Sequence, residues 1–415
     1  MRALSAPALL VCLAGAAVAG DWDTTIQKGT EAFHRGAWTD ALLLFESAWP
    51  MAETPVEQAI TANDIGATLH AVPRDRDALP WFRRSVSIWQ SLPNRPAELT
   101  ETGLGLVDVY RVLGDFPAAE TTLHDLLKAG VGPEQRGALY NTLGDVLREQ
   151  VRNDEARRNF EAALALESLS PKRRTETWLG LADLDRGEGN FTASIEGWNR
   201  ALDFARAARS ASDEALALRG LGLTRIDAGD FAKAGPALRR SLALFQQEPI
   251  PQFRQLAAAY TCLGRFYGQQ GKLSLGEEAY LQALALERKN SGENHPQTAV
   301  IMEALAGIYA MQKRFGEAHD LASHALRTMT ASFGEKSIPA AGALATVALV
   351  EQLENRLEPA AADYASAIGT MRARGAASNQ NTLDVMDRYA QVLTSLRRPD
   401  EAKELRKFVK AFRPR

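Results

Sequence analysis

Histidine and cysteine, the side chains most often used for metal binding and nucleophilic catalysis, are sparse in this chain of 415 residues, which has six histidines and two cysteines. His319 and His324 are five residues apart, whereas two ligands on one helical face are three or four apart. Cys262 lies in an apolar helical pattern, which predicts a buried, unreactive thiol. Because no metal, phosphate-binding or nucleophile motif accompanies these residues, we expect no metal, no cofactor and no catalytic site.

The most regular polar pattern is an acid followed three residues later by an arginine. It occurs in three copies: Asp108 and Arg111, Asp145 and Arg148, and Asp183 and Arg186. Residues three apart share a helical face, and each such pair contributes only ~0.2–0.5 kcal/mol to a helix. The pattern has two interpretations: a by-product of duplication, or a polar surface for a peptide ligand that carries its own charges and amides.

These pairs belong to a repeat that fills most of the chain. A small residue recurs every 37 to 42 residues, at Ala41, Ala78, Ala119, Ala156, Ser194, Ala234, Gly276, Ala318, Ala360 and Ala402. Twelve residues before each anchor, nine of ten positions hold glycine or alanine: Gly29, Gly66, Val107, Gly144, Ala182, Gly222, Gly264, Ala306, Ala348 and Ala390. Two antiparallel helices approach closely only where neither carries bulk at the crossing. The sequence therefore predicts ten αα-hairpins.

Large side chains four residues after the anchor are expected to fill the space beside the small ones, as at Phe45, Phe82, Phe160, Trp198, Tyr280 and Tyr364. Two copies depart from the pattern. Val107 replaces the small residue in the third copy, and Val151 and Asn153 replace the turn glycine and the aromatic in the fourth. We expect these two copies to pack more loosely.

The pattern resembles that of tetratricopeptide repeat proteins over roughly residues 22–412. It is carried, in various copies, by Trp178, Leu221, Gly222, Tyr110, Ala119, Phe160 and Ala163. From Gly264 onward, the 42-residue period and the segment 292–299 resemble the longer repeats of kinesin light chains. The resemblance implies an all-α fold, a right-handed superhelical α-solenoid of stacked helix-turn-helix repeats. It also implies that the first helix of each repeat lines a concave surface, where the predicted peptide-binding groove comprises Asp108, Arg111, Asn141, Asp145, Arg148, Asp183, Arg186, Arg219 and Arg265.

The chain divides into three predicted parts. Residues 1–19 have the basic start, apolar stretch and small-residue ending of a signal peptide, with an uncleaved anchor as the alternative. Residues 20–248 hold repeats one to six. Residues 249–415 hold repeats seven to ten with a C-terminal capping helix, after a break at Pro249 and Pro251 that no helix can continue. We therefore expect an exported protein, periplasmic or secreted, with no membrane span after cleavage.

Charge excludes some partners. With 48 lysines and arginines against 51 acids, the net charge of -3 offers no attraction for nucleic acid or an anionic membrane. The sequence favours a non-enzymatic exported scaffold that binds a protein or peptide in its concave groove. The alternative is a structural or assembly component of a cell-envelope complex that acts through its convex face, or through a first repeat exposed near Trp22 and Trp38. The oligomeric state stays open.

Overall fold

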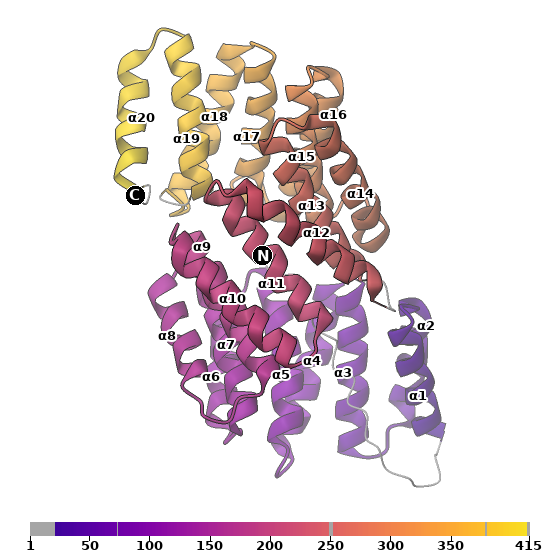
Figure 1. The fold of residues 1–415 in the computed structure, drawn as a ribbon. Coiled ribbons are helices and arrows are strands. Elements are labelled where there is room, and N and C mark those ends of the chain that lie inside the picture. The colour runs from indigo at the N-terminus through magenta and orange to yellow at the C-terminus, as the bar shows by residue number, and fades with distance from the viewer. Residues whose placement is uncertain (1–20, 73, 249–251, 378–379, 413–415) are drawn as a thin grey trace. The chain divides into compact units, whose positions relative to one another are not determined.

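The computed structural model describes residues 21–72, 74–248, 252–377 and 380–412, and in these residues it contains α-helices, one short 3-10 helix and no strand (Figure 1). The first helices of the repeats are α1 (Asp21–His34), α3 (Pro55–Ala71), α5 (Pro96–Leu113), α7 (Pro133–Glu149), α9 (Pro171–Gly187), α11 (Ala211–Asp227), α13 (Phe253–Gln269), α15 (Pro296–Met311), α17 (Ile338–Leu353) and α19 (Gln380–Ser395). The second helices are α2 (Trp38–Ala48), α4 (Asp75–Ser91), α6 (Phe116–Lys128), α8 (Asn153–Leu164), α10 (Phe191–Ala207), α12 (Phe231–Gln247), α14 (Leu273–Ser291), α16 (Phe315–Phe333), α18 (Leu357–Ala373) and α20 (Pro399–Phe412). The 3-10 helix η1 is Trp49–Met51.

In the described residues the helices form ten successive pairs, so the protein is an all-α solenoid, as predicted. The second helices of the last four repeats begin 42 residues apart, which confirms the longer period of that region. The handedness of the superhelix stays a prediction. The predicted signal peptide, residues 1–19, and the two prolines at 249 and 251 lie outside the described residues.

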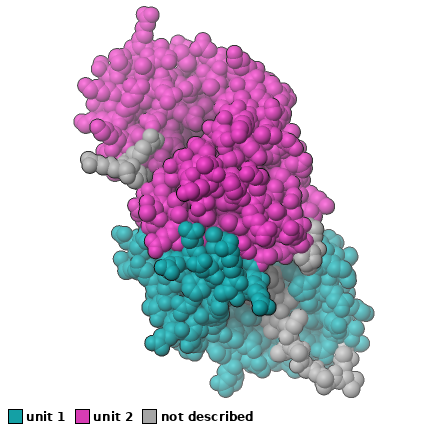
Figure 2. Space-filling view, viewed as in Figure 1, with its two compact units in different colours: residues 1–184, 199–210 teal, residues 185–198, 211–415 magenta. Residues whose placement is uncertain are grey.

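Contacts divide the chain into two compact units (Figure 2). Unit 1 comprises residues 1–184 and 199–210, and unit 2 comprises residues 185–198 and 211–415. The division therefore falls inside α9 and α10 and not at the change of repeat period near residue 249, which stays a prediction as a domain boundary.

The small-residue columns pack as their spacing predicts. Every anchor residue is buried, including Ser194 and Gly276. A Cβ atom added to Gly144 would lie 2.7 Å from the Phe160 ring, so this glycine leaves the space that the aromatic fills. Similar contacts occur between Gly29 and Phe45 and between Gly264 and Tyr280. Close helix approach is thus the physical reason for the repeat signature.

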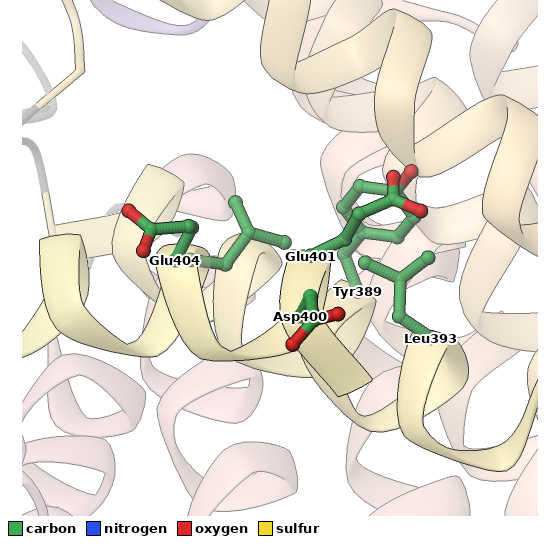
Figure 3. A pocket seen from close by; sticks show the side chains of 6 residues that line it. Tyr389, Leu393, Asp400, Glu401 and Glu404 are labelled. Carbon is green, nitrogen blue, oxygen red and sulfur yellow. The ribbon is translucent and has the colours of Figure 1, made fainter. Parts of the chain in front are cut away.

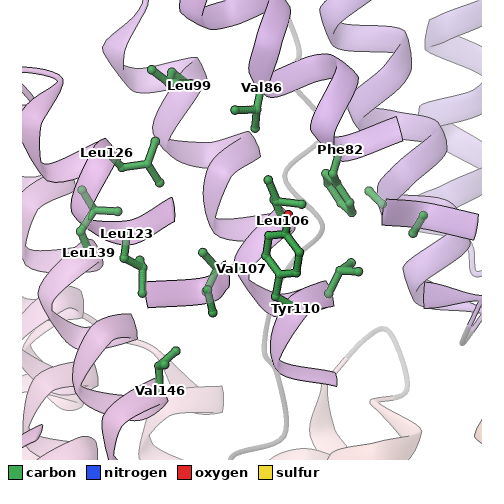
Figure 4. Close-up of a cluster of buried hydrophobic side chains, with 14 of the residues drawn as sticks. Phe82, Val86, Leu99, Leu106, Val107, Tyr110, Leu123, Leu126, Leu139 and Val146 are labelled. Atoms are coloured by element: carbon green, nitrogen blue, oxygen red, sulfur yellow. The ribbon is translucent and has the colours of Figure 1, made fainter. Parts of the chain in front are cut away.

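The third repeat keeps its core although Val107 breaks the pattern. Val107 is fully buried, and the residue four after the anchor is Leu123 instead of an aromatic. Both belong to a hydrophobic cluster that runs from Phe82 to Leu139 and beyond (Figure 4). Val107 is larger than the usual glycine or alanine, and Leu123 is smaller than the usual aromatic residue, so the two side chains together fill a similar volume. The expectation of looser packing is therefore wrong for this copy.

The turn of the fourth repeat retains its backbone shape without glycine. Gly114 has a φ of 75° in the third repeat, and Val151 has a φ of 62° at the same turn of the fourth. Positive φ is strained for a β-branched residue and costs of order 1–3 kcal/mol. The missing glycine therefore leaves local strain in an otherwise regular hairpin.

The first and last described repeats differ in how their helices are covered. Trp22 donates its indole N–H to Thr61 Oγ1 at 2.9 Å, and Trp38 packs edge-on against Phe33 with ring centroids 4.8 Å apart. Both tryptophans are half-buried, so the first repeat does not present them as freely exposed rings. At the other end, α20 buries only Ala402 and Val409 and is otherwise largely polar, as a terminal repeat requires.

Candidate functional site

The acid and arginine pairs predicted on the first helices form ion pairs in unit 1. Asp108 Oδ1 lies 3.0 Å from Arg111 Nη1 in α5, and Asp145 Oδ1 lies 3.4 Å from Arg148 Nη2 in α7. At about 100° per residue, these positions turn away from the second helices. We call this side of the first helices the inner face. The structure therefore places these four predicted residues together on one face.

Each arginine also reaches the next first helix along the chain. Arg111 Nη2 lies 2.6 Å from Glu149 Oε1 of α7, and Arg148 Nη1 lies 3.0 Å from Asp183 Oδ2 of α9. The result is a ladder of ion pairs that links α5, α7 and the part of α9 in unit 1. Sequence reasoning missed Glu149, because its partner is 38 residues away and only stacking brings the two together.

The ladder is largely shielded from water. The Arg111 side chain is 10% exposed, and its partners Asp108 and Glu149 are 14% and 19% exposed. Burial raises the pKa of Asp108 although the Arg111 charge opposes it. Burial acts to lower the pKa of Arg111, but its hydrogen bond to Glu149 and the Asp108 charge outweigh this effect and raise the pKa. The guanidinium stays charged, and the three groups bind one another.

Asn141 is the predicted site residue with unmet hydrogen-bonding capacity. It lies one helical turn before Asp145 on the inner face of α7 and is 5% exposed. Neither its Nδ2 nor its Oδ1 has a hydrogen-bond partner among the described residues. A buried, unpaired amide costs about 1–3 kcal/mol, and one peptide unit could satisfy both its donor and its acceptor.

The remaining predicted residues lie in unit 2 and form a separate set. Arg186 Nη1 lies 3.3 Å from Asp227 Oδ2, and Arg265 pairs with the other oxygen of Asp227. Arg219 donates to Gln255 Oε1 at 2.9 Å. Asp227 and Gln255 are absent from the sequence-based list because they occupy different repeat positions from the acid and arginine pairs.

Cysteine and histidine side chains outside this face make structural contacts within the fold. Cys262 is a free, buried thiol, as expected, and burial raises its pKa, which disfavours the reactive thiolate. His295 is the N-cap of α15, where its Nδ1 accepts from the Gln297 amide. His319 Nε2 lies 2.8 Å from Glu354 Oε2. Within the described ranges, no group of three or more potential metal ligands is found.

One open pocket lies between α19 and α20 (Figure 3). Its apolar part is formed by Tyr389, Leu393 and Leu405, and acidic side chains line the rest: Asp400, Glu401 and Glu404. Glu401 pairs with Arg398 at 2.7 Å. The pocket therefore combines an apolar surface with carboxylates, without a nucleophile or a histidine beside them.

Comparison with protein families identifies the repeats. Two tetratricopeptide repeat models match the sequence, one over residues 255–331 and the other over residues 104–171 and 141–205. Over these residues the chain consists of tetratricopeptide repeats. This confirms the resemblance drawn from the small-residue columns, and such arrays generally act as non-catalytic scaffolds. No sequence among the curated proteins matches the chain.

Several solved structures share the solenoid fold at low sequence identity. A Rap protein complexed with competence and sporulation factor has a TM-score of 0.60 and 14% identity, covering 86% of this chain and 98% of that one. The apo quorum sensor NprR from B. thuringiensis has a TM-score of 0.55 and 15% identity, covering 84% and 97%. Repeats of a putative kinesin light chain from Podospora anserina match with a TM-score of 0.38 and 17% identity, covering 49% and 95%. The first two likenesses support the tetratricopeptide fold.

The helices that the structure describes are too short or too polar to be membrane spans, because none of them combines the length and the apolar character that crossing a bilayer requires.

Proposed function

We propose that this tetratricopeptide repeat protein is a non-enzymatic scaffold that binds a protein or peptide partner on the inner face of its first helices. Repeat solenoids present extended surfaces of this kind to their partners. The Rap structure, which was solved with competence and sporulation factor, supports the proposal by analogy of fold alone.

The unpaired amide of Asn141 is the observation that carries the proposal. The charges around it are matched to one another, so a partner gains little from replacing them. Asn141, in contrast, has a donor and an acceptor that no described residue satisfies. Both amide atoms are covered in this structure, so the Asn141 side chain must turn outward before it can bond the backbone of an extended partner segment.

Site-directed photocrosslinking tests the inner face directly. A photoreactive residue at Val112, which is 48% exposed next to Arg111 in α5, should yield partner adducts in the native compartment. The matched control is Lys128 in α6, whose side chain is 76% exposed on a second helix. Adducts at Lys128 and none at Val112 would contradict the proposal.

A partly exposed aromatic pair supports a second candidate function, docking or assembly through the outer surface. Trp49 and Trp81 pack edge-on with centroids 5.1 Å apart, and the Arg84 guanidinium lies 5.2 Å from the Trp49 ring. Leu43 and Met51 nearby in sequence are 62% and 40% exposed. If the protein assembles through this region, Trp81→Ala should convert oligomers to monomers in light scattering while Asn141→Leu leaves them intact.

Export remains part of the proposal on the strength of residues 1–19, which have the pattern of a signal peptide. The test is the amino-terminal sequence of the protein purified from its own cells, together with its distribution between cell fractions. A mature chain beginning at Gly20 outside the cytoplasm is expected, and an intact Met1 in the cytoplasmic fraction would refute it.

A further inference from the structure

The inner face of α15 and α17, in unit 2, is apolar. Val300 and Met311 of α15 are 46% and 47% exposed, and Leu353 of α17 is 41% exposed. Val300 and Met311 are eleven residues apart, which is close to three turns, so they lie on one side of α15. Leu353 occupies the position of Met311 one 42-residue period later. We call these three residues the apolar stripe.

At two positions on these helices a glycine leaves no side chain. Gly307 lies in line with Val300 and Met311, and the atom nearest to a Cβ added there is Leu349 Cδ2 of α17 at 3.9 Å. A Cβ atom added to Gly342 of α17 would meet no heavy atom within 4 Å. Gly307 itself is buried and Gly342 is partly exposed, so the backbone of a partner could approach α17 closely at Gly342.

A single carboxylate, Glu303, lies within this surface. It follows Val300 by three residues and is partly exposed. The Thr346 hydroxyl of α17 donates to its Oε2 at 3.3 Å. No lysine, arginine or histidine of the described chain forms an ion pair with it, and burial raises its pKa to about 7.

Two other covered carboxylates in unit 2 have cations beside them. Asp227 is held by Arg186 and Arg265. Glu351 lies 3.5 Å from Arg356, and its second oxygen is fully covered. Glu303 combines partial exposure with the lack of an ion-paired cation among the described residues, so it is open to a cation supplied by a partner.

We propose that the apolar stripe and Glu303 together bind an extended apolar segment of a partner that carries one lysine or arginine, whose cation pairs with Glu303. This inference rests on the proposed scaffold function and names the chemistry of the partner for one part of the inner face. The stripe from Val300 to Met311 is about 16 Å long along the helix axis. That length accommodates about five residues of extended chain, with the basic side chain nearer the Val300 end.

Short blocked peptides with alanine, valine and leucine around one central position are the probe. Three sets differ only in that central residue, which is lysine, glutamine or glutamate, and calorimetry measures their binding to the mature protein. We expect the lysine set to bind about tenfold more tightly than the glutamine set, and the glutamate set to bind most weakly.

Three variants separate charge from packing. Glu303→Gln should weaken the lysine set about tenfold and remove the preference for lysine, whereas Glu303→Asp should retain the preference. Glu358→Gln, an exposed carboxylate on α18, is the matched control and should change nothing. Met311→Ser should weaken all three sets equally. Circular dichroism verifies that each variant keeps its helices.

The experimental outcomes distinguish a failure of this inference from a failure of the scaffold proposal. Peptides that bind without preference for lysine, or with a preference that survives Glu303→Gln, overturn the inference and leave the scaffold proposal standing. Peptides that crosslink only to α5 or α7 do the same. If none of the sets binds, the inference fails, and the native crosslinks at Val112 decide separately on the scaffold.

Discussion

The inner faces of α7 and α15 use the same repeat positions for opposite purposes. In α7 the positions one, four and five after the small residue hold Asp145, Arg148 and Glu149, which take part in the ion-pair ladder. In α15 the same positions hold Gly307, Ala310 and Met311. One backbone frame thus carries a charged surface in unit 1 and an apolar surface in unit 2.

This difference shows that the surface with more charges is not necessarily the one that recognises a charged ligand. The ladder in α5 and α7 contains many ions, but each arginine contacts two acids of the protein itself. The surface of α15 and α17 contains one ion, Glu303, without a cation among the described residues. Since a paired group has less to gain from a ligand, the sparse surface should discriminate ligand charge more strongly than the dense one.

The largest expected effect comes from breaking the ladder. Arg111→Met removes the cation shared by Asp108 and Glu149 and leaves two covered carboxylates uncompensated, which should destabilise the protein by about 3–5 kcal/mol. Urea-induced unfolding followed by tryptophan fluorescence measures the change. Lys128→Met, which removes an exposed pair with Asp125, is the control and should change stability by less than about 1 kcal/mol.

A second variant tests whether the ladder acts as a unit. Arg111→Met combined with Glu149→Gln removes one of the uncompensated charges, so it should recover part of the stability lost in the single variant. Equal losses for Arg111→Met and Lys128→Met would show that the ladder behaves as an ordinary surface network, and the comparison between the two faces would lose its basis.

The isolated carboxylate of unit 2 should show the opposite response. Burial raises the pKa of Glu303 to about 7, so the folded protein holds this proton more tightly than the unfolded chain does. Its contribution to stability is complete below the ordinary glutamate pKa of about 4.3 and is lost as the pH rises through about 7. Glu303→Gln should therefore be more stable than the wild type by up to about 4 kcal/mol near pH 9 and nearly equal to it near pH 4.

Unfolding curves at the two pH values provide this measurement, and Glu358→Gln is again the control. A destabilised Glu303→Gln variant near pH 9 would mean that the ionised carboxylate has a partner within the fold. The unmet charge on which the inner face of α15 depends would then be absent.

The sequence predicted the repeat frame well because that frame depends on residue volume. The contact between Gly144 and Phe160 follows from a constant spacing, and one sequence is enough to see it. Val107 was harder to interpret, because its larger volume is offset by Leu123, and compensation between two columns has no signature in either column alone.

The candidate site was less predictable because its partners come from neighbouring repeats. The spacing of Asp145 and Arg148 predicted their pairing within one helix, but the contact of Arg111 with Glu149 depends on how two repeats stack. Glu303 escaped notice for a related reason. Its significance lies in the absence of a nearby cation among the described residues, which no local motif expresses.

Asn141→Leu should separate recognition from stability in unit 1. Replacing an unpaired buried amide with an apolar side chain of similar size should leave the free energy of unfolding unchanged or raise it by about 1 kcal/mol. Capture of the partner in a pull-down should nevertheless fall about tenfold or more. A variant that loses stability instead would indicate that the amide is satisfied within the fold, and the proposal for the inner face of α7 would then fail.

The smallest effect is expected from the apolar stripe itself. Met311→Ser removes a side chain that is 47% exposed, so little apolar area leaves a buried environment and stability should change by less than about 0.5 kcal/mol. The same substitution at a buried methionine, Met302→Ser, should cost several kcal/mol. If thermal unfolding gives similar losses for the two variants, Met311 packs within the protein and is not available to a partner. A negligible loss at Met311 together with weaker binding of every peptide set is the result that only an open docking surface explains, because a residue that contributes nothing to the fold can then affect affinity only by contact with the ligand.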